Sequence, residues 1–404
     1  MHRKVVIFSM ILIFISTSLL GCTSKTEIYD LAMVMLVGID KGEKNPNNIM
    51  VTVQIALPAN ARGSTGSPTG TGMGDPIWTS TGEGKSIFEA IRNIGRYSSR
   101  RLFWAHNHAI VISEEYARDI GITDVIDFFT RNNQLRMRTW VVVTPKKAKN
   151  LVATKTGLEV IPGQSLNKLF RYNEIIAEAP RTDMRILTAA YMSESSHPVL
   201  AKVDIKNRGV SADRPGEFGS TPQVELSGSA VFNRAKMVGW LDSKESRGLL
   251  CFIEGFNSAV IALKCPSDRS KPASVELKDS KFKVTPYYKN GKITFTIEST
   301  TYAELVELGC STNYENPRIL ADLEEQLSAE MKSNIEGVIK KAQKDYKIDF
   351  LKLGETFNNR YPSEWKELRD EWKEIFPTID ITIKVDANVI SPALLENPTR
   401  DVKD

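Results

Sequence analysis

The chain has 404 residues, of which 41% are hydrophobic and 25% charged, a composition typical of globular domains with room for two or three cores. Its formal net charge is +4, and removal of residues 1–21 would lower it to +2, because Arg3 and Lys4 would be lost without any acidic residue. This balance argues against a nucleic-acid partner, which usually requires a marked basic excess.

The N-terminus has the pattern of a secretory signal. Two basic residues precede an apolar run over residues 5–20, whose 16 residues fall short of the roughly 20 that a membrane-spanning helix needs. The run ends in Leu-Leu-Gly-Cys at residues 19–22, which resembles the lipobox of bacterial lipoproteins. We therefore expect residues 1–21 to be a lipoprotein signal peptide and Cys22 to be acylated. The alternative is a cysteine that merely follows a signal or an anchor helix.

Three further cysteines, Cys251, Cys265 and Cys310, remain if Cys22 is acylated. An odd number cannot pair completely, so the sequence does not predict a disulfide framework. Cys251 and Cys265 lie in apolar runs and are expected to be small core residues. The sequence contains no CxxC motif or Cys/His cluster that would predict a zinc site.

The first elements expected after the signal are two strands. Residues 31–40 and 49–57 flank the turn-like segment KGEKNPNN, and apolar residues alternate through the second run. This pattern predicts a β-hairpin with one buried face. Residues 58–85 are rich in Gly, Ser, Thr and Pro, so we expect a long mobile loop that is either a binding element or slack chain.

Residues 86–143 alternate between helix and strand signals. Ser86 and Glu89 form a capping-box pattern, and HAIVIS predicts a buried strand. Ser113 and Gly121 bracket a short helix, a second helix follows directly, and LRMRTWVVVT predicts another strand. Helical patterns continue in SLNKLFRYNEIIAEA and TDMRILTAAYM. A mixed α+β domain is expected here.

Residues 206–222, KNRGVSADRPGEFGSTP, interrupt this periodicity and are expected to contain a domain boundary. Beyond them QVELSGSAVF and MVGWL predict strands, Asp242 and Glu245 cap a helix, and SAVIALK predicts a further strand.

The last segment combines a hairpin with a long helix. Asn290-Gly291 is a strong hairpin-turn signal. Apolar residues at helical spacing over 320–338 predict a helix that faces a core, with a coiled-coil partner as the alternative. The alternating segment TIDITIKVDANVI is expected to add a strand to the same sheet.

Together these elements predict an α+β fold of three mixed α/β domains, with antiparallel or mixed sheets and a long helix in the C-terminal domain. The expected divisions are a signal peptide (1–21), an N-terminal domain (22–205), a middle domain (206–273) and a C-terminal domain (274–404).

Three motifs suggest chemistry. TGEGKS, residues 81–86, is similar to the end of a phosphate-binding loop, but Thr79 stands where the motif needs glycine and no strand directly precedes it. SLNK at 165–168 matches SxxK, yet KTG (155–157) precedes it instead of following far downstream, and STN (311–313) is a weak third match. We therefore interpret Ser86 and Ser165 as helix caps.

The third motif is HNH, in which His106 and His108 would lie on one face of a strand and offer two metal ligands. No third ligand accompanies them, and His197 is isolated, so ordinary strand histidines are expected.

Two further groups of residues are expected to have ordinary structural roles. An aromatic stripe of helical spacing is expected to be core and not a sugar platform; it comprises Trp365, Leu368, Trp372 and Phe376. Arg131, Arg136 and Arg138 are expected on a solvated or paired face, with anionic lipid as the alternative partner.

In order along the chain, several segments resemble the Ger(x)C family, the lipoprotein C subunits of bacterial spore germinant receptors. They include EIYDLAMVMLVGIDKG, GEGKSIFEAIRNIGRYSSRRLFWAHNHAIVISEEYARDIGI, GSAVFNRAKMVGWLDSKESRGLLCFIEG and DFLKLGETFNNRYPSEWKELRDEWKEIFPTIDITIKVDANVI. They span nearly the whole chain, and Cys22 matches the family's lipidation position.

The resemblance implies a non-catalytic protein, lipid-anchored to the outer face of the spore inner membrane. It would work beside an integral-membrane A subunit and a transporter-like B subunit in the response to small nutrients. No catalytic, metal or cofactor-binding residue is implied, and no cofactor is expected.

Two other classes remain as alternatives. A solute-binding lipoprotein of an uptake system would need two doubly wound lobes around a cleft, which the predicted hairpins and long helix do not favour. An exported hydrolase would rest only on SLNK and HNH.

Overall fold

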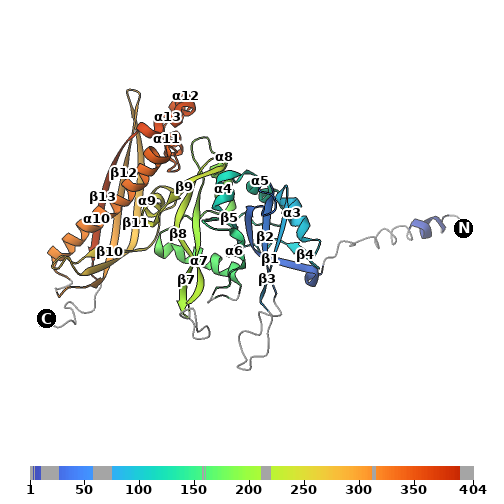
Figure 1. The fold of residues 1–404 in the computed structure, drawn as a ribbon. Coiled ribbons are helices and arrows are strands. Elements are labelled where there is room, and N and C mark those ends of the chain that lie inside the picture. Colours follow the sequence, from blue (N-terminus) through green and yellow to red (C-terminus); the bar gives the residue numbers. More distant parts are fainter. Residues whose placement is uncertain are drawn as a thin grey trace.

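The computed structural model describes residues 3, 5–10, 27–57, 75–156, 159, 161–210, 220–311 and 315–391. These residues form two β-sheets with helices packed on them (Figure 1). One sheet has nine strands in the order β3-β2-β1-β5-β6-β7-β8-β9, with β4 paired to β1, and the other has the order β10-β11-β12-β13. The expected α+β class with mixed sheets and a long C-terminal helix is confirmed.

The large sheet combines parallel pairing in its middle with antiparallel pairing at both ends. Its strands are β1 (Leu31–Lys41), β2 (Ile49–Ala56), β3 (Ile77–Gly84), β4 (Arg101–Phe103), β5 (Ala109–Ser113), β6 (Trp140–Thr144), β7 (Val199–Val210), β8 (Ser220–Asn233) and β9 (Lys236–Leu241).

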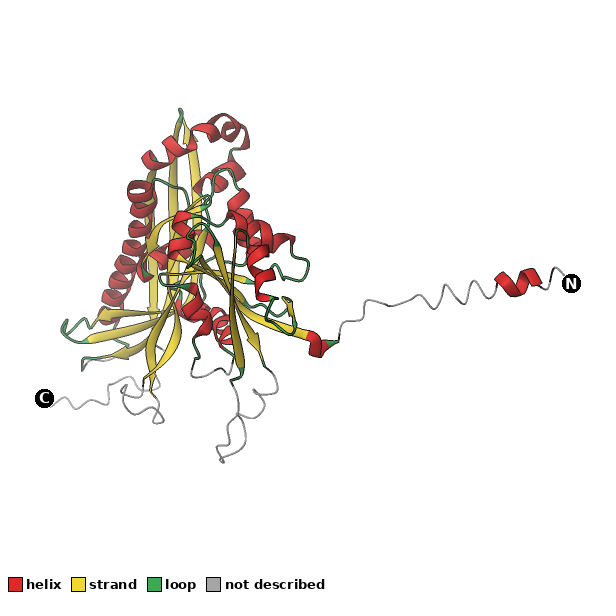
Figure 2. Cartoon of the chain, turned by 45° about the vertical axis from the view of Figure 1, so that its right-hand side comes forward, coloured by secondary structure: helices red, strands yellow, loops and turns green. Residues whose placement is uncertain are grey.

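Helices cover both faces of the large sheet (Figure 2). The strands' alternate side chains therefore enter two separate cores. One layer contains α3 (Ile87–Ile94), α4 (Glu114–Asp119), α5 (Thr123–Arg131) and α8 (Met184–Met192). The other contains α6 (Ala148–Ala153) and α7 (Pro162–Ile176). The predicted hairpin of β1 and β2 is confirmed, but its expected solvent face is not, because β2 is buried along its whole length.

The glycine-rich segment predicted as a loop over 58–85 contains the edge strand β3, which is a correction. Residues 58–74 lie outside the described residues. The glycines serve packing: a Cβ on Gly82 would lie 2.2 Å from the Ala90 carbonyl oxygen of α3, and one on Gly84 would lie 2.5 Å from the Ala90 nitrogen. Their small size therefore allows α3 to approach β3 closely.

The second sheet carries the long helix predicted from the sequence. It consists of β10 (Ala259–Lys264), β11 (Pro272–Lys289), β12 (Lys292–Leu308) and β13 (Asp380–Ile390). Asn290 and Gly291 have φ values of 53° and 76°, as the predicted hairpin turn requires, and β13 joins β12 in parallel. The helices are α10 (Pro317–Lys340), α11 (Leu353–Arg360), α12 (Pro362–Leu368) and α13 (Trp372–Ile375), with short turns η3 (Lys341–Tyr346), η4 (Arg369–Glu371) and η5 (Phe376–Thr378).

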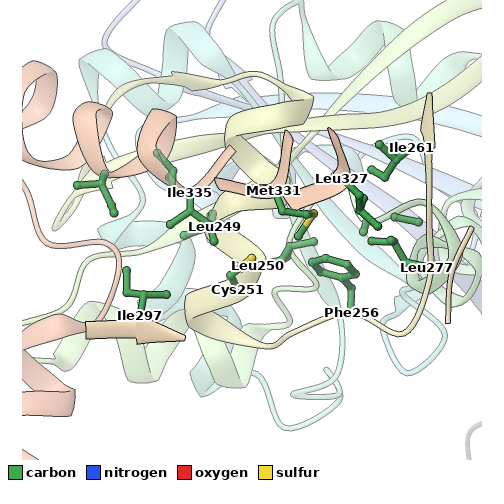
Figure 3. Packing of buried hydrophobic residues seen from close by; sticks show 14 of the residues in the cluster. Leu249, Leu250, Cys251, Phe256, Ile261, Leu277, Ile297, Leu327, Met331 and Ile335 are labelled. Carbon is green, nitrogen blue, oxygen red and sulfur yellow. The ribbon is translucent and has the colours of Figure 1, made fainter. Parts of the chain in front are cut away.

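Helix α9 (Ser243–Ile253) connects the two sheets. The predicted capping box is confirmed, since Asp242 accepts from the Glu245 N–H and Glu245 accepts from the Asp242 N–H. The helix packs between β8 and α10, and its residues Leu249 and Leu250 enter a core shared with α10 and the second sheet (Figure 3). The apolar stripe of α10 is thus buried in this core, as predicted.

Residues 206–273, the expected middle domain, contribute strands to both sheets. Strand β7 runs across residues 205 and 206, β8 and β9 complete the large sheet, and β10 begins the second sheet. Within the stretch 206–222, the described residues 206–210 belong to β7 and 220–222 to β8.

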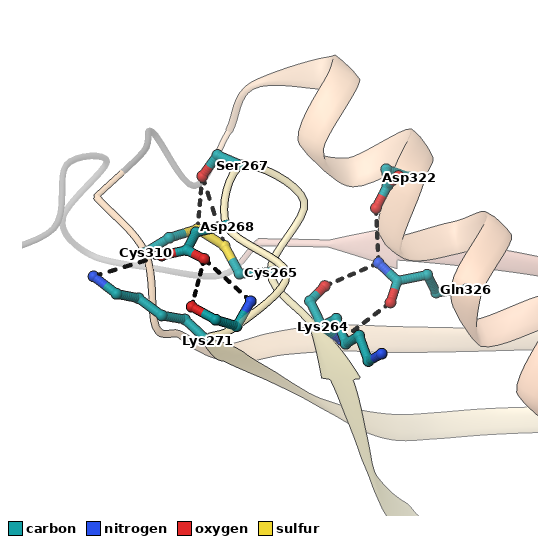
Figure 4. The surroundings of a disulfide bond; sticks show 9 residues. Lys264, Cys265, Ser267, Asp268, Lys271, Cys310, Asp322 and Gln326 are labelled. Carbon is teal, nitrogen blue, oxygen red and sulfur yellow. Dashed lines mark hydrogen bonds and ion pairs between the residues drawn. A yellow bond between two sulfur atoms is a disulfide. The ribbon is translucent and has the colours of Figure 1, made fainter.

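Cys265 and Cys310 form a disulfide with a Cα–Cα distance of 6.2 Å across 45 residues (Figure 4). The sequence predicted Cys265 as a small core residue; it is buried, but the disulfide was not predicted. Sheet pairing explains the encounter: β11 lies between β10 and β12, and Ala273 faces both Leu263 and Leu308. Cys251 is a free buried thiol, as expected.

Candidate functional site

The expected lipidation residue, Cys22, lies outside the described residues. After Cys22, the described residues resume at residue 27, and the short helix η1 (Ile28–Asp30) leads into β1. Ile28 and Tyr29 are 72% and 68% exposed. Any attachment at Cys22 would therefore hold this end of the large sheet close to a membrane, since only nine positions separate Cys22 from Leu31.

A groove of about 1030 Å³ opens at the same end, between α3, α5 and the segment 95–104. Its location can be followed in Figure 1, where α3, α5 and β4 gather near the blue start of β1. Strand β4 ties the groove to the start of β1, because Arg101 pairs with Leu31 and Phe103 with Met33 in a parallel ladder.

The groove has an aromatic and aliphatic floor and a basic rim. Phe88, Ile91, Trp104 and Phe128 are among the apolar lining residues. The Phe88 and Phe128 ring centroids are 6.4 Å apart, so the two rings form one apolar surface although Phe88 is 52% exposed. Exposure of so large a side chain in a hollow is typical of a binding surface.

The basic residues of the groove differ in their partners. Arg131 forms an ion pair with Asp127 (Nε to Oδ1, 2.7 Å), and the Arg92 guanidinium lies 4.9 Å from the Phe88 ring centroid. Among the described residues, no carboxylate forms an ion pair with the other rim arginines. These are Arg96, Arg100 and Arg101.

The expected face of Arg131, Arg136 and Arg138 is solvated or paired, as predicted: Arg131 is paired, and the other two side chains are exposed. Of the groove's arginines, the sequence analysis singled out only Arg131. The other rim arginines lie in a segment that was quoted only for its resemblance to the family.

TGEGKS forms the end of β3 and the start of α3, not a phosphate loop. Ser86 caps α3 by accepting from the Glu89 N–H at 3.2 Å, which confirms its predicted role. The Glu89 carboxylate reaches back to the Lys85 N–H at 2.8 Å, one residue before the cap.

The SLNK serine is not a helix cap, which corrects our interpretation. Ser165 lies inside α7, because this helix begins earlier, at Pro162. Lys168 binds Glu159 at 2.5 Å, and Lys155 of KTG binds Asp75, so both lysines have acidic partners. Gly157 of KTG and residues 312–313 of STN lie outside the described residues.

His106 lies in a turn and His108 directly before β5, so the two do not lie on one face of a strand as expected. Burial, together with the nearby His106 and arginines, lowers the pKa of His108. Burial also lowers the pKa of His197 to about 4, and its Nδ1 accepts from the Arg234 N–H at 3.1 Å. Within the described residues no group of three potential ligands could hold a metal ion.

The aromatic stripe is core, as predicted, and it surrounds a buried acid that the sequence did not reveal. Trp365, Trp372 and Phe376 are at most 5% exposed. The Asp349 carboxylate accepts from the Trp372 Nε1–H at 3.0 Å and from the Leu353 and Gly354 N–H groups. Burial outweighs these donors and raises the pKa of Asp349 to about 6. Because all three of these donors belong to the protein's own core, we interpret Asp349 and its partners as a structural cluster and not as a binding site.

Among the described residues, no helix combines the length and apolar character needed to cross a bilayer. The groove between α3 and α5 offers binding chemistry. Its arginines can donate to an anionic group, while its described lining contains serine hydroxyls but neither histidine nor cysteine.

Comparisons with known proteins agree over both halves of the chain. Residues 24–205 match the family described as "Spore germination protein N-terminal domain", and residues 227–392 match "Spore germination B3/ GerAC like, C-terminal". Spore germination protein KC of Bacillus subtilis (strain 168) is 28% identical, with 94% of each chain covered. Spore germination protein B3 of the same strain is 23% identical, with 94% of this chain and 96% of the relative covered.

A solved structure, described as "Crystal Structure of the GerBC protein", shares the fold. The TM-score is 0.54 at 19% identity, with 88% of this chain and 96% of that chain covered. Fold and family domains together define a two-part α+β protein of spore germination. The chain belongs to the Ger(x)C family, as the sequence resemblance implied, and its role lies in germination.

Proposed function

We propose that this chain is a non-catalytic, membrane-tethered subunit of a spore germinant receptor and that the response to small nutrients requires it. The observation that carries the proposal is the match of both family domains in order, and the lipobox-like residues 19–22 directly before the first domain support it. Acylation of Cys22 would anchor the chain to the outer face of the spore inner membrane.

The proposed partners are the integral-membrane A and B subunits of the receptor. A single acyl chain binds a membrane only marginally, so stable attachment needs more than one contact. Membrane-embedded partners and additional acyl chains are both consistent with this requirement.

A solute-binding lipoprotein of an uptake system is less well supported. That class places its ligand between two doubly wound lobes. Here the two sheets differ in size and pairing, α9 fills the space between them with apolar side chains, and the groove lies at one end of the large sheet.

Deletion tests the proposal. Spores without this chain should lose the response to the nutrients of this receptor but still germinate after a nutrient-independent trigger, and restoring the chain should restore the response. In detergent extracts, a tagged chain should co-purify with two multi-spanning membrane proteins. An undiminished nutrient response in spores that lack all related chains would contradict the proposal.

A further inference from the structure

We propose that the groove between α3 and α5 is a second membrane contact, in which Arg96, Arg100 and Arg101 bind the phosphate of an anionic phospholipid. The inference deepens the proposed function, because it relies on a location at a membrane. Its test does not depend on acylation of Cys22, because the tested chain carries no acyl group.

Position is the first argument. Arg101 is held opposite Leu31 in the β4–β1 ladder, so the basic rim is fixed to the same chain segment that leads to Cys22. An anchor so close in sequence would bring the rim within reach of headgroups. Ile28 and Tyr29, which precede β1 and are largely exposed, provide apolar and aromatic surface of the kind that favours a membrane interface.

Charge is the second argument. The three rim arginines have no ion-pair partner among the described residues, whereas Arg131 across the groove is paired with Asp127. A guanidinium can donate two parallel hydrogen bonds to one phosphate, and clustered basic residues bind anionic membranes. Unpaired arginines at an anchored end therefore complement an anionic headgroup.

The floor is the third argument. The exposed Phe88 ring and neighbouring Phe128 give apolar surface to the same groove that the basic residues line. A phospholipid combines a phosphate with apolar acyl chains, and so matches both the basic and the apolar lining of the groove. This pairing favours lipid over a free inorganic anion, which would leave the floor uncovered.

Vesicle flotation tests the proposal. The chain from residue 22 onward, carrying Cys22→Ser so that no acyl chain is attached, is mixed with vesicles of phosphatidylcholine alone or with added phosphatidylglycerol. We expect it to bind the phosphatidylglycerol vesicles preferentially and to dissociate as salt is raised. The groove variant Arg96→Gln/Arg100→Gln/Arg101→Gln should bind these vesicles at least about tenfold more weakly.

The matched control removes three charges from exposed lysines of the C-terminal part, Lys283→Gln/Lys289→Gln/Lys373→Gln. It should bind like the parent, and thermal unfolding of each variant checks that the fold is intact. Equal binding of the groove variant, indifference to lipid charge, or binding of an acidic peptide without vesicle binding would overturn the proposal. Because the tested chain carries no acyl group, such a failure leaves the proposed tether at Cys22 untouched.

Discussion

Arg101 lies directly opposite Leu31 in the parallel ladder between β4 and β1. This pairing joins β1, the first described strand after the expected lipidation residue, to the rim of the groove between α3 and α5. The end of the molecule that an anchor would hold near a bilayer is thus also the end with unpaired arginines. The predictions below concern the fold that keeps this end in place and the tether itself.

Substitution Gly248→Ala should destabilise the contact between α9 and α10. A Cβ at this position would lie 2.1 Å from the Asn334 carbonyl oxygen, so the helices must separate, and we expect a loss of about 1–3 kcal/mol in the free energy of unfolding. Urea denaturation measures it. Gly337→Ala is the control: its nearest neighbour would be 3.8 Å away, and alanine in the helix should be neutral or stabilising. Equal effects of both substitutions would contradict the packing role.

The Cys265–Cys310 disulfide should stabilise the second sheet. Cys310→Ser is expected to lower the free energy of unfolding by about 2–4 kcal/mol, because the bond closes a long loop in the unfolded chain. Peptide mapping without reductant should recover Cys265 linked to Cys310 and Cys251 as a free thiol. A linked peptide that contains Cys251 would refute this pairing.

Asp349 should make stability depend on pH. Its pKa in the folded protein is about 6, above the ordinary value of 3.8, so the folded state holds this proton to higher pH than the unfolded chain. The stability gained from protonated Asp349 is complete below 3.8 and is lost as pH rises through about 6.

We therefore compare the free energies of unfolding of the wild type and Asp349→Asn. The wild-type value minus the variant value should fall by up to about 3 kcal/mol between pH 3.8 and about pH 6, and stay level at higher pH. Denaturation at a series of pH values measures the difference. Asp370→Asn, at an exposed position on η4, is the control and should lack this slope. A difference that grows with pH would show that the donors around Asp349, including Trp372, outweigh its burial.

Local sequence rules predicted much of the fold. Asp242 and Glu245, Ser86 and the Asn290-Gly291 turn each depend on residues a few positions apart, and all adopt the predicted structure. The failures involve distant partners. Strand β3 was not predicted, because its glycines, which allow α3 to pack closely, are typical of a loop in the sequence. The Cys265–Cys310 disulfide was not predicted, because it depends on the order of the strands in the sheet.

The candidate sites divide in the same way. The lipobox-like pattern at residues 19–22 is a local signal, and acylation of Cys22 stays a prediction from it. The groove was not predicted from the sequence, because its lining comes from α3, α5 and the 95–104 segment, which only the folded chain brings together. Asp349 was missed for the same reason, since Trp372 and Gly354 reach it only in the folded chain.

The most direct test of the central claim is substitution of Cys22 by alanine in sporulating cells, with Ser24→Ala as the neighbouring control. We measure the amount of the chain in the spore inner membrane and the rate of nutrient-triggered germination. We expect Cys22→Ala to lower the amount of the chain in the membrane fraction or remove it, and to impair nutrient-triggered germination. Ser24→Ala should change neither the membrane amount nor the germination rate. Unchanged membrane retention together with an unchanged nutrient response in the Cys22→Ala spores would contradict it.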